Sequence, residues 1–98
     1  MVVLITGSAG HLGEALMRTL PQERLQPIGL DLKASPFTQK VGSIVDRDFV
    51  RSCMHGVDAV IHTATLHKPH VATHSRQDFI DTNITGTLNL LEEAVNAG

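Results

Sequence analysis

The sequence predicts an α/β fold with a parallel sheet, and three features of the chain support this prediction. The run from Val2 to Ile5 is aliphatic throughout, as in a strand that is buried on both faces. The turn from Thr6 to Gly13 follows at once and contains three glycines, and apolar residues then recur at helical spacing. Strand-like and helix-like segments alternate along the rest of the chain, which is typical of right-handed βαβ units.

The other elements are predicted from local signals in chain order. The first helix begins near Gly10 and ends at Pro21, and the residues at helical spacing in it are Leu12, Ala15, Leu16 and Thr19. Strands are expected at Pro27–Asp31, from Val41 onward and at Asp58–Thr63. Loops are expected at residues 33–39 and 66–74. Two more helices are expected: a short one capped by Asp46 and followed by Gly56, and a long last one capped by Ser75.

The last predicted helix carries one apolar stripe. Its members lie three or four residues apart, as on one helical face: Ile80, Ile84, Leu88, Leu91 and Val95. Because a helix beside a sheet buries its apolar face, we expect this stripe to cover the sheet.

Composition limits the class of protein. The 98 residues suffice for one small domain, and the net charge of −2 comes from eight basic and ten acidic residues spread along the chain. Without a basic patch, nucleic acid is not an expected partner. The apolar runs are too short for a membrane span, and the run at Val2–Ile5 is too short for a signal peptide. A single cysteine, Cys53, fits a reducing compartment, so we expect a cytoplasmic protein.

The glycine-rich turn has the spacing G-x-x-G-x-x-G. Gly7 permits a tight turn, Gly10 lets a pyrophosphate approach the backbone, and Gly13 lets the helix pack against the sheet. The N–H groups of His11 and Leu12 would face the anion at the positive end of the helix. The alternative is that the glycines serve chain geometry alone.

Asp31 closes the second predicted strand. A carboxylate at this place can accept hydrogen bonds from both hydroxyls of an adenosine ribose. It would also repel a 2′-phosphate at short range, which predicts NAD in preference to NADP. The alternative is a solvated aspartate in a loop.

Four blocks in this order resemble the extended short-chain dehydrogenase/reductases, the NAD-dependent epimerase/dehydratase family. They are residues 4–13, 29–31, 58–64 and 83–92, and the last two are similar to the family's D-x-V-I-H-x-A-A and N-V-x-G-T-x-N-L-L-E segments. The resemblance covers essentially the whole chain. It implies that residues 1–98 form the NAD-binding front half of a Rossmann-type, doubly wound parallel sheet, with strand order 3-2-1-4.

The resemblance also implies where the cofactor lies. Where the family often has G-D-(I/L)-x-D, this chain has Gly42-Ser43-Ile44-Val45-Asp46. Ser43 and Ile44 are therefore expected at the adenine, with Ser43 in place of the family's adenine-binding aspartate. By position, Thr63, Ala64 and Thr65 resemble the stretch beneath the cofactor near the nicotinamide ribose. Asn83 resembles a helix asparagine close to the cofactor, and its alternative is a hydrogen bond to the preceding loop.

The histidines before the last helix raise the question of a metal site. His67, His70 and His74 lie three and four residues apart, but Pro69 disfavours a helix that would align them. No Cys, Asp or Glu lies within the cluster, so no metal is expected. We expect this loop to border the cofactor and substrate cleft, and His62 to be a core or cofactor-facing residue.

The family's acid–base group is a tyrosine in a Tyr-x-x-x-Lys pair, which follows the fifth strand, and its lysine lowers the pKa of the tyrosine. This sequence contains no tyrosine, so no catalytic residue is expected in it. The expected function is the NAD-binding portion of an epimerase, dehydratase or reductase that acts on a nucleotide sugar. The alternative is a non-catalytic dinucleotide-binding sensor or regulatory module.

Members of the family commonly form homodimers by packing the last of these helices against a second copy. With the apolar stripe facing the sheet, such a contact would need a second face. Phe79, Leu90 and Ala94 are the residues expected to contribute to it.

Overall fold

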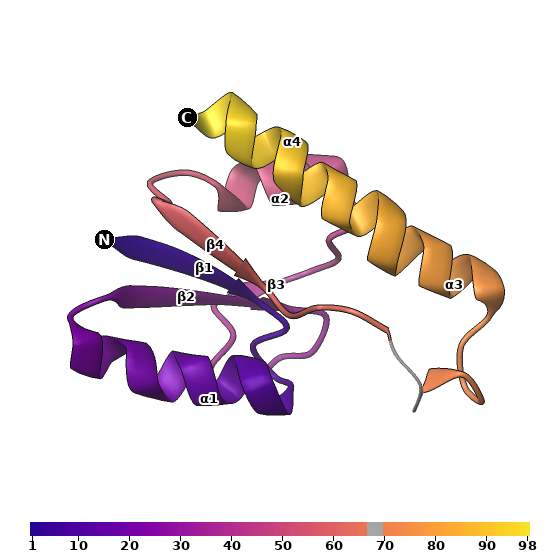
Figure 1. The fold of residues 1–98 in the computed structure, drawn as a ribbon, viewed down its shortest axis with the longest axis horizontal. Coiled ribbons are helices and arrows are strands. Elements are labelled where there is room, and N and C mark those ends of the chain that lie inside the picture. The colour runs from indigo at the N-terminus through magenta and orange to yellow at the C-terminus, as the bar shows by residue number, and fades with distance from the viewer. Residues whose placement is uncertain (67–69) are drawn as a thin grey trace.

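A computed structural model describes residues 1–66 and 70–98, and it shows a parallel sheet between two layers of helices (Figure 1). The strands are β1 (Val2–Thr6), β2 (Gln26–Asp31), β3 (Lys40–Val41) and β4 (Ala59–His62). Their order is β3-β2-β1-β4 and every pairing is parallel, so the predicted fold class and strand order are confirmed. The third strand is brief, as expected, but it lies earlier than predicted, because Val41 ends it rather than begins it.

The helices lie on both faces of the sheet, as Figure 1 shows. The α1 helix (His11–Thr19) covers one face and continues into the 3₁₀ helix η1 (Leu20–Glu23). The α2 helix (Arg47–Cys53) and the α4 helix (Thr87–Ala97) cover the other. The α3 helix (Arg76–Ile80) leads into α4 through the π-helical segment η3 (Asp81–Gly86). Within the described residues, no helix combines the length and apolar character that a membrane span requires.

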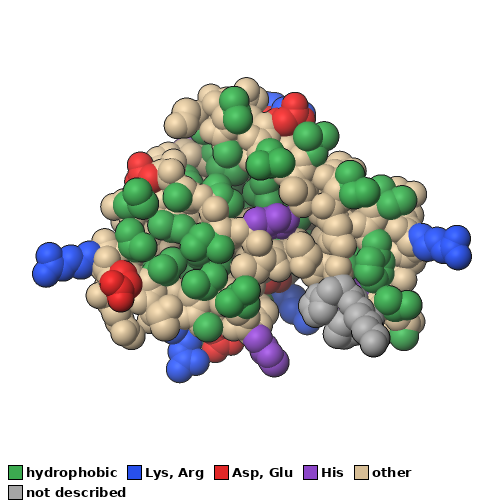
Figure 2. Space-filling model, viewed as in Figure 1, with side chains coloured by type: hydrophobic (Ala, Val, Ile, Leu, Met, Phe, Trp, Pro, Cys, Tyr) green, Lys and Arg blue, Asp and Glu red, His purple; other side chains and the backbone are tan. Residues whose placement is uncertain are grey.

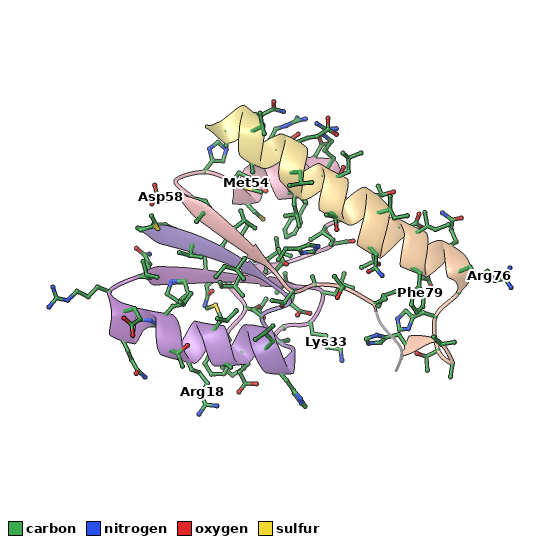
Figure 3. All side chains as sticks on the ribbon, in the orientation of Figure 1. Arg18, Lys33, Met54, Asp58, Arg76 and Phe79 are labelled. Carbon is green, nitrogen blue, oxygen red and sulfur yellow. The ribbon has the colours of Figure 1, made fainter. Side chains whose placement is uncertain are left out.

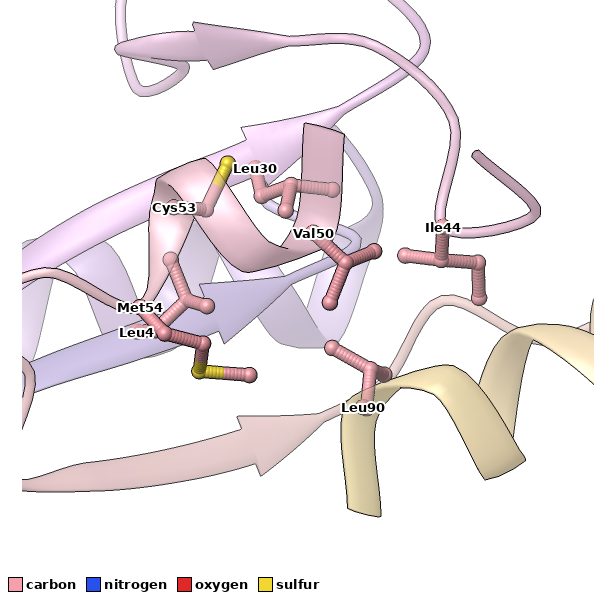
Figure 4. Close-up of a cluster of buried hydrophobic side chains, with 7 residues drawn as sticks. All are labelled: Leu4, Leu30, Ile44, Val50, Cys53, Met54 and Leu90. Carbon is pink, nitrogen blue, oxygen red and sulfur yellow. The ribbon is translucent and has the colours of Figure 1, made fainter. Parts of the chain in front are cut away.

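The β1 strand forms the centre of the core because both of its faces are covered. Val3 and Ile5 pack with Met17 beneath α1. Leu4 points the other way, into a cluster with Leu30 and residues of α2 and α4, which Figure 4 shows. Alternate side chains of one strand therefore hold both helical layers.

The predicted helix caps are confirmed. The Asp46 side chain accepts a hydrogen bond from the Phe49 N–H at 3.2 Å, and α2 begins at the next residue. Ser75 and Asp78 form a capping box, in which each side chain accepts from the backbone N–H of the other. These short local bonds satisfy N–H groups that have no partner within the helix, so they fix where each helix begins.

The prediction that the apolar stripe of the last helix covers the sheet is wrong. The side chains of Ile80, Ile84, Leu88, Leu91 and Val95 are exposed by 46–80%. The opposite face is buried instead, and its members are Gly86, Asn89, Leu90 and Glu93, with Ala94 half-buried. Leu90 and Ala94 therefore pack into the core and do not form the second, outward face that was expected of them.

Small and polar residues face the core on this helix because they make specific contacts. A β-carbon at Gly86 would lie 2.5 Å from Cδ1 of Ile44, so a side chain there would force Ile44 or the helix to shift. Asn89 donates hydrogen bonds to the carbonyl oxygens of Ile44 and Val45, at 2.9 and 3.1 Å. The helix thus packs closely against the segment before α2. The face that makes this contact cannot be identified from hydrophobicity alone.

A buried carboxylate joins α4 to α2. Glu93 is only 2% exposed, and its oxygens lie 2.8 Å from Nε of Arg47 and 3.2 Å from Nε of Arg51. Hydrogen bonds from the two arginines hold the pKa of the Glu93 carboxyl below its ordinary range, and the bond from Arg47 has the larger effect. The carboxylate is therefore buried only in the company of two cations, as burial of a charge requires.

The buried face of the first helix also differs from the face that the spacing of its apolar residues suggests. Gly13 and Met17 are its buried residues, and Leu16 packs beside them. Leu12 is 63% exposed. Figure 2 shows further apolar side chains exposed on the viewed face of the molecule.

The burial of Leu90 in the core predicts how truncation of its side chain affects stability. Replacing Leu90, which is 4% exposed, by alanine should lower the free energy of unfolding by about 2–5 kcal/mol, the usual cost of a large core cavity. The matched control is Leu32→Ala, at a residue that is 70% exposed, and it should change stability by no more than about 0.5 kcal/mol. Denaturant unfolding of both variants measures the difference, and equal losses would contradict the assignment.

Candidate functional site

A cleft of about 910 Å³ opens where the parallel strands end. Figure 3 marks this end by Lys33, which lines the cleft, and the opposite end of the sheet by Asp58. The chain crosses from β1 to β2 on one side and reaches β4 on the other, so strand order reverses at this point. Open α/β sheets bind ligands at such a switch point.

Eleven of the twelve site residues predicted from the sequence line this one cleft. They are Gly7, Gly10, His11, Leu12, Gly13, Asp31, Ser43, Ile44, Thr63, Ala64 and Thr65. The twelfth, Asn83, does not line it. The loop before the last helix, which was expected to border the cleft, contributes Leu66, His70 and His74, and the helical segments after it add Asp78 and Thr82, which were not predicted. Segments that are far apart in the chain thus meet at one place.

Two of the three glycines in the turn are required by the chain itself. Gly7 has φ +78°, in the left-handed region that favours glycine. A β-carbon at Gly13 would lie 1.9 Å from the carbonyl oxygen of Gly7, which no side chain can do. The turn therefore folds back on itself so tightly that α1 begins directly above the end of β1.

Gly10 differs from its two neighbours because the chain does not require a glycine there. Its backbone is extended, with φ −82° and ψ 171°, and an added β-carbon would come no closer than 3.4 Å to another part of the chain. The residue is exposed, lines the cleft and precedes the first turn of α1. Its missing side chain leaves open the approach to the positive end of the helix.

No side chain caps the start of α1. The N–H groups of the first helical turn, which include those of His11 and Leu12, have no partner within the helix and face outward along its axis. Both residues line the cleft. This part of the site can therefore receive an anion through backbone donors.

The Asp31 carboxylate is held in place by two backbone groups. Its Oδ2 accepts from the N–H of Ala9 at 3.0 Å, and its Oδ1 accepts from the N–H of Lys33 at 2.9 Å. Each carboxylate oxygen has a second lone pair to offer. The group is thus oriented at the end of β2 and can still accept hydrogen bonds from a pair of hydroxyls.

A chain of hydroxyl groups fixes the loop after β2 against the glycine-rich turn. Oγ of the fully buried Ser8 lies 2.8 Å from Oγ1 of Thr38, which lies 2.6 Å from Oγ of Ser35. These residues escaped prediction, because serine and threonine in loops carry no periodic signal. Their contacts keep the turn and the end of β2 in a fixed relation.

Ser43 and Ile44 form one wall of the cleft. The Ser43 hydroxyl accepts a hydrogen bond from the N–H of Val45 at 3.1 Å, so part of its capacity is used within its own turn. Ile44 is 5% exposed and belongs to the core cluster with Leu90. The wall is consequently rigid and largely apolar.

The segment after β4 forms another wall and is anchored to β1. The Thr6 hydroxyl oxygen accepts hydrogen bonds from the N–H groups of Thr63 and Ala64, at 3.0 and 3.2 Å. The same oxygen lies 2.6 Å from Nδ1 of His62, whose Nε2 lies 3.0 Å from Oγ1 of Thr87. Burial lowers the pKa of the His62 imidazole. Neither Thr6 nor Thr87 was singled out from the sequence.

Asn83 hydrogen-bonds to the preceding loop, which was the alternative to a contact with the cofactor. Its Oδ1 accepts from the N–H of Leu66 and its Nδ2 donates to the carbonyl oxygen of the same residue, both at 2.8 Å. The amide is therefore occupied in fixing the loop after β4, and its effect on the cleft is indirect.

His70 and His74 also line the cleft, with ring centroids 5.3 Å apart in an edge-to-face arrangement. His67, the third histidine of the sequence cluster, lies outside the described residues. Among residues 1–66 and 70–98, no three Cys, His, Asp or Glu side chains come together in a geometry that could hold a metal ion.

Comparison with known proteins gives consistent matches over the whole chain. The model of the NAD dependent epimerase/dehydratase family matches residues 3–98. Sterol demethylase protein B of Methylococcus capsulatus is 32% identical, over 100% of this chain and 32% of its own length. UDP-glucose 4-epimerase of Erwinia amylovora is 30% identical, over 100% of this chain and 34% of its own length.

A solved structure of a short-chain dehydrogenase/reductase superfamily protein from Agrobacterium tumefaciens, with bound NAD, superimposes with a TM-score of 0.86. It is 31% identical, and the match covers 100% of this chain and 30% of that one. The chain thus spans about a third of the length of the curated relatives and of this structure.

Proposed function

The chain belongs to the NAD dependent epimerase/dehydratase family, and from this premise we propose that it binds NAD as the cofactor-binding portion of a nucleotide-sugar epimerase, dehydratase or reductase. The observation that carries the proposal is the pairing, in one cleft, of the open Gly10 turn with the fixed Asp31 carboxylate. The first suits a pyrophosphate and the second suits a ribose, and a dinucleotide contains both.

In this proposal the pyrophosphate lies over Gly10, against the N–H groups of His11 and Leu12. A phosphate oxygen can approach the backbone there because no β-carbon stands in its way. The positive end of the α1 dipole adds a favourable interaction with the negative charge. The chain contributes these groups without rearrangement, since the turn is fixed by the close contact between Gly13 and Gly7.

The adenosine ribose then lies at Asp31, where both carboxylate oxygens have capacity for its two hydroxyls. A 2′-phosphate at this position would place two negative groups within about 4 Å of each other, which costs about 1–4 kcal/mol between water and a protein surface. We therefore assign NAD rather than NADP. The adenine lies against the wall at Ser43 and Ile44, where the apolar surface favours stacking over a specific side-chain hydrogen bond.

The nicotinamide end would lie toward Thr63, Ala64 and Thr65, on the far side of the cleft from Asp31. Bound NAD would supply a hydride acceptor and, after reduction, a hydride donor. This chain's part is to bind and orient the cofactor. We propose that the proton-transfer group lies outside these 98 residues, because they contain no tyrosine to serve as the family's acid–base group.

One relative, the UDP-glucose 4-epimerase, supports the nucleotide-sugar class, whereas another is named for sterol demethylation. A substrate screen of the intact protein that includes both classes, read out as NAD-dependent turnover, separates these possibilities. Turnover of neither class, with NAD still bound, would favour a non-catalytic sensor.

We also propose a homodimer contact on the exposed stripe of the last helix. Ile84, Leu88 and Leu91 are 64%, 51% and 62% exposed, and Ile80 and Val95 extend the row at its ends. An aligned apolar row of this kind on a surface marks an interaction site. A second copy fits it because the same row, turned by a two-fold axis, is its own complement.

Gly10→Val should abolish most NAD binding and leave the fold intact. Its β-carbon meets no close chain atom, but its branched side chain would occupy the space assigned to the pyrophosphate. We expect an affinity loss of about 10- to 150-fold, because a lost charge-assisted hydrogen bond costs about 1.5–3 kcal/mol. Calorimetric titration with NAD measures it. Unchanged affinity in a folded variant would refute the placement.

Asp31→Asn should narrow the preference for NAD over NADP by about tenfold or more, since it removes the charge that repels the 2′-phosphate. The matched control is Asp58→Asn, at an exposed carboxylate that also accepts from a backbone N–H but lies at the opposite end of the sheet. Binding of both cofactors to the three proteins is compared. Tighter binding of NADP than of NAD by the unchanged protein would overturn the assignment.

Charged residues on the stripe should dissociate the dimer. Ile84→Glu with Leu91→Glu places two carboxylates in the contact and, through the two-fold axis, four in all. Sedimentation of the intact protein should show a monomer that still binds NAD. A dimer that persists unchanged would exclude this face as the contact.

A further inference from the structure

His62 connects three parts of the molecule that bear on the cleft. Its ring lies at the end of β4 and lines the cleft. One ring nitrogen meets Thr6 of β1 at 2.6 Å, and the other meets Thr87 of α4 at 3.0 Å. The ring is held at both ends, although the proposed function gives it no contact with the cofactor.

The contacts of Thr6 decide which ring nitrogen carries the proton. A hydroxyl oxygen has two lone pairs and one proton. At Thr6, the N–H groups of Thr63 and Ala64 take the lone pairs. The hydroxyl proton is left for the third neighbour, Nδ1 of His62, which must therefore accept. The ring is then neutral, with its proton on Nε2, where it donates to Oγ1 of Thr87.

We propose that His62 is a positioning residue for the cofactor floor: as the neutral Nε2–H tautomer, it orients the Thr6 hydroxyl, which in turn holds the backbone of Thr63 and Ala64. This rests on the proposed NAD function, because that segment is assigned to the nicotinamide end. The hydrogen bonds of the relay run in one direction: Thr6 donates to His62, and His62 donates to Thr87. The Thr6 oxygen also accepts from the backbone of Thr63 and Ala64.

Protonation of His62 would break the relay. A second proton on Nδ1 would point at a Thr6 oxygen whose lone pairs are both used. The Thr63 N–H is shared with the Thr6 carbonyl oxygen, at 3.2 Å, and could keep that partner, so the weakened contacts would be those of the Thr6 hydroxyl with Thr63 and Ala64. Burial lowers the pKa of His62 from its usual 6.5, which keeps the ring neutral near pH 7. Its contribution to stability is therefore complete above pH 6.5, and it is lost as the pH falls through the lowered pKa of the folded state.

The cleft holds other ionisable groups besides His62. The elements that hold the ring, β1 and α4, present the hydroxyls of Thr6 and Thr87. The ionisable groups that line the rest of the described cleft are His11, Asp31, Lys33, His70, His74 and Asp78. The sign of the His62 relay is therefore a weakening of NAD binding in acid that disappears when His62 alone is replaced.

The test compares two replacements of His62 in the intact protein. In His62→Asn, the side-chain oxygen takes the place of Nδ1 as an acceptor and does not titrate. His62→Leu has no acceptor. The control His55→Asn makes the first change at an exposed histidine outside the cleft. NAD affinity is measured by calorimetry from pH 8 down to the lowest pH at which the protein stays folded, and nitrogen NMR of ¹⁵N-histidine protein assigns the tautomer.

We expect His62→Asn to keep its affinity at pH 8 and to lose the weakening in acid that the unchanged protein and His55→Asn show. His62→Leu should bind NAD about tenfold more weakly at every pH, the loss expected for one hydrogen bond. An Nδ1–H tautomer, or equal losses in the Asn and Leu variants, would overturn the relay. If His62→Leu does not fold, the tautomer of the unchanged protein and the pH dependence of His62→Asn still test the relay. Absence of NAD binding at pH 8 would instead reject the proposed function, and the tautomer would still test the relay.

Discussion

The contact between Gly13 and the carbonyl oxygen of Gly7 is the constraint on which the rest of the site depends. No β-carbon fits between them, so the chain leaves β1 and enters α1 in one compact turn. Because β1 is buried on both faces, this turn is joined to the strand at the centre of the core. The uncapped start of α1 is thereby held over the strand ends, where β2 brings Asp31 and β4 brings the segment from Thr63.

Features that arise from neighbouring residues could be predicted from the sequence. The buried β1 run, the tight turn and the caps at Asp46 and Ser75 each depend on contacts within a few residues, and all were found where expected. The strand order and the gathering of the site residues at one cleft followed from the alternation of elements and from the family resemblance. Their roles toward a ligand remain predictions.

Features that arise from distant residues could not be predicted in the same way. The inward face of α4 was misassigned because its contacts are polar or require a missing side chain, as at Glu93 and Gly86. The same holds for Thr6 and Thr87, whose hydroxyls meet His62 across 56 and 25 residues of sequence. Such hydrogen-bond networks fix the walls of the cleft. They cannot be recognised in the sequence, because isolated serine and threonine residues show no characteristic spacing or periodicity.

The most direct measurement of the central claim is amide hydrogen exchange of the intact protein with and without NAD. The account predicts that NAD slows exchange in residues 10–13 and 63–65 and leaves residues 47–56, on the far side of the core, unchanged. Protection at the turn would place the pyrophosphate on the first N–H groups of α1. NAD binding that protects other segments and leaves residues 10–13 at their free rate would contradict the account.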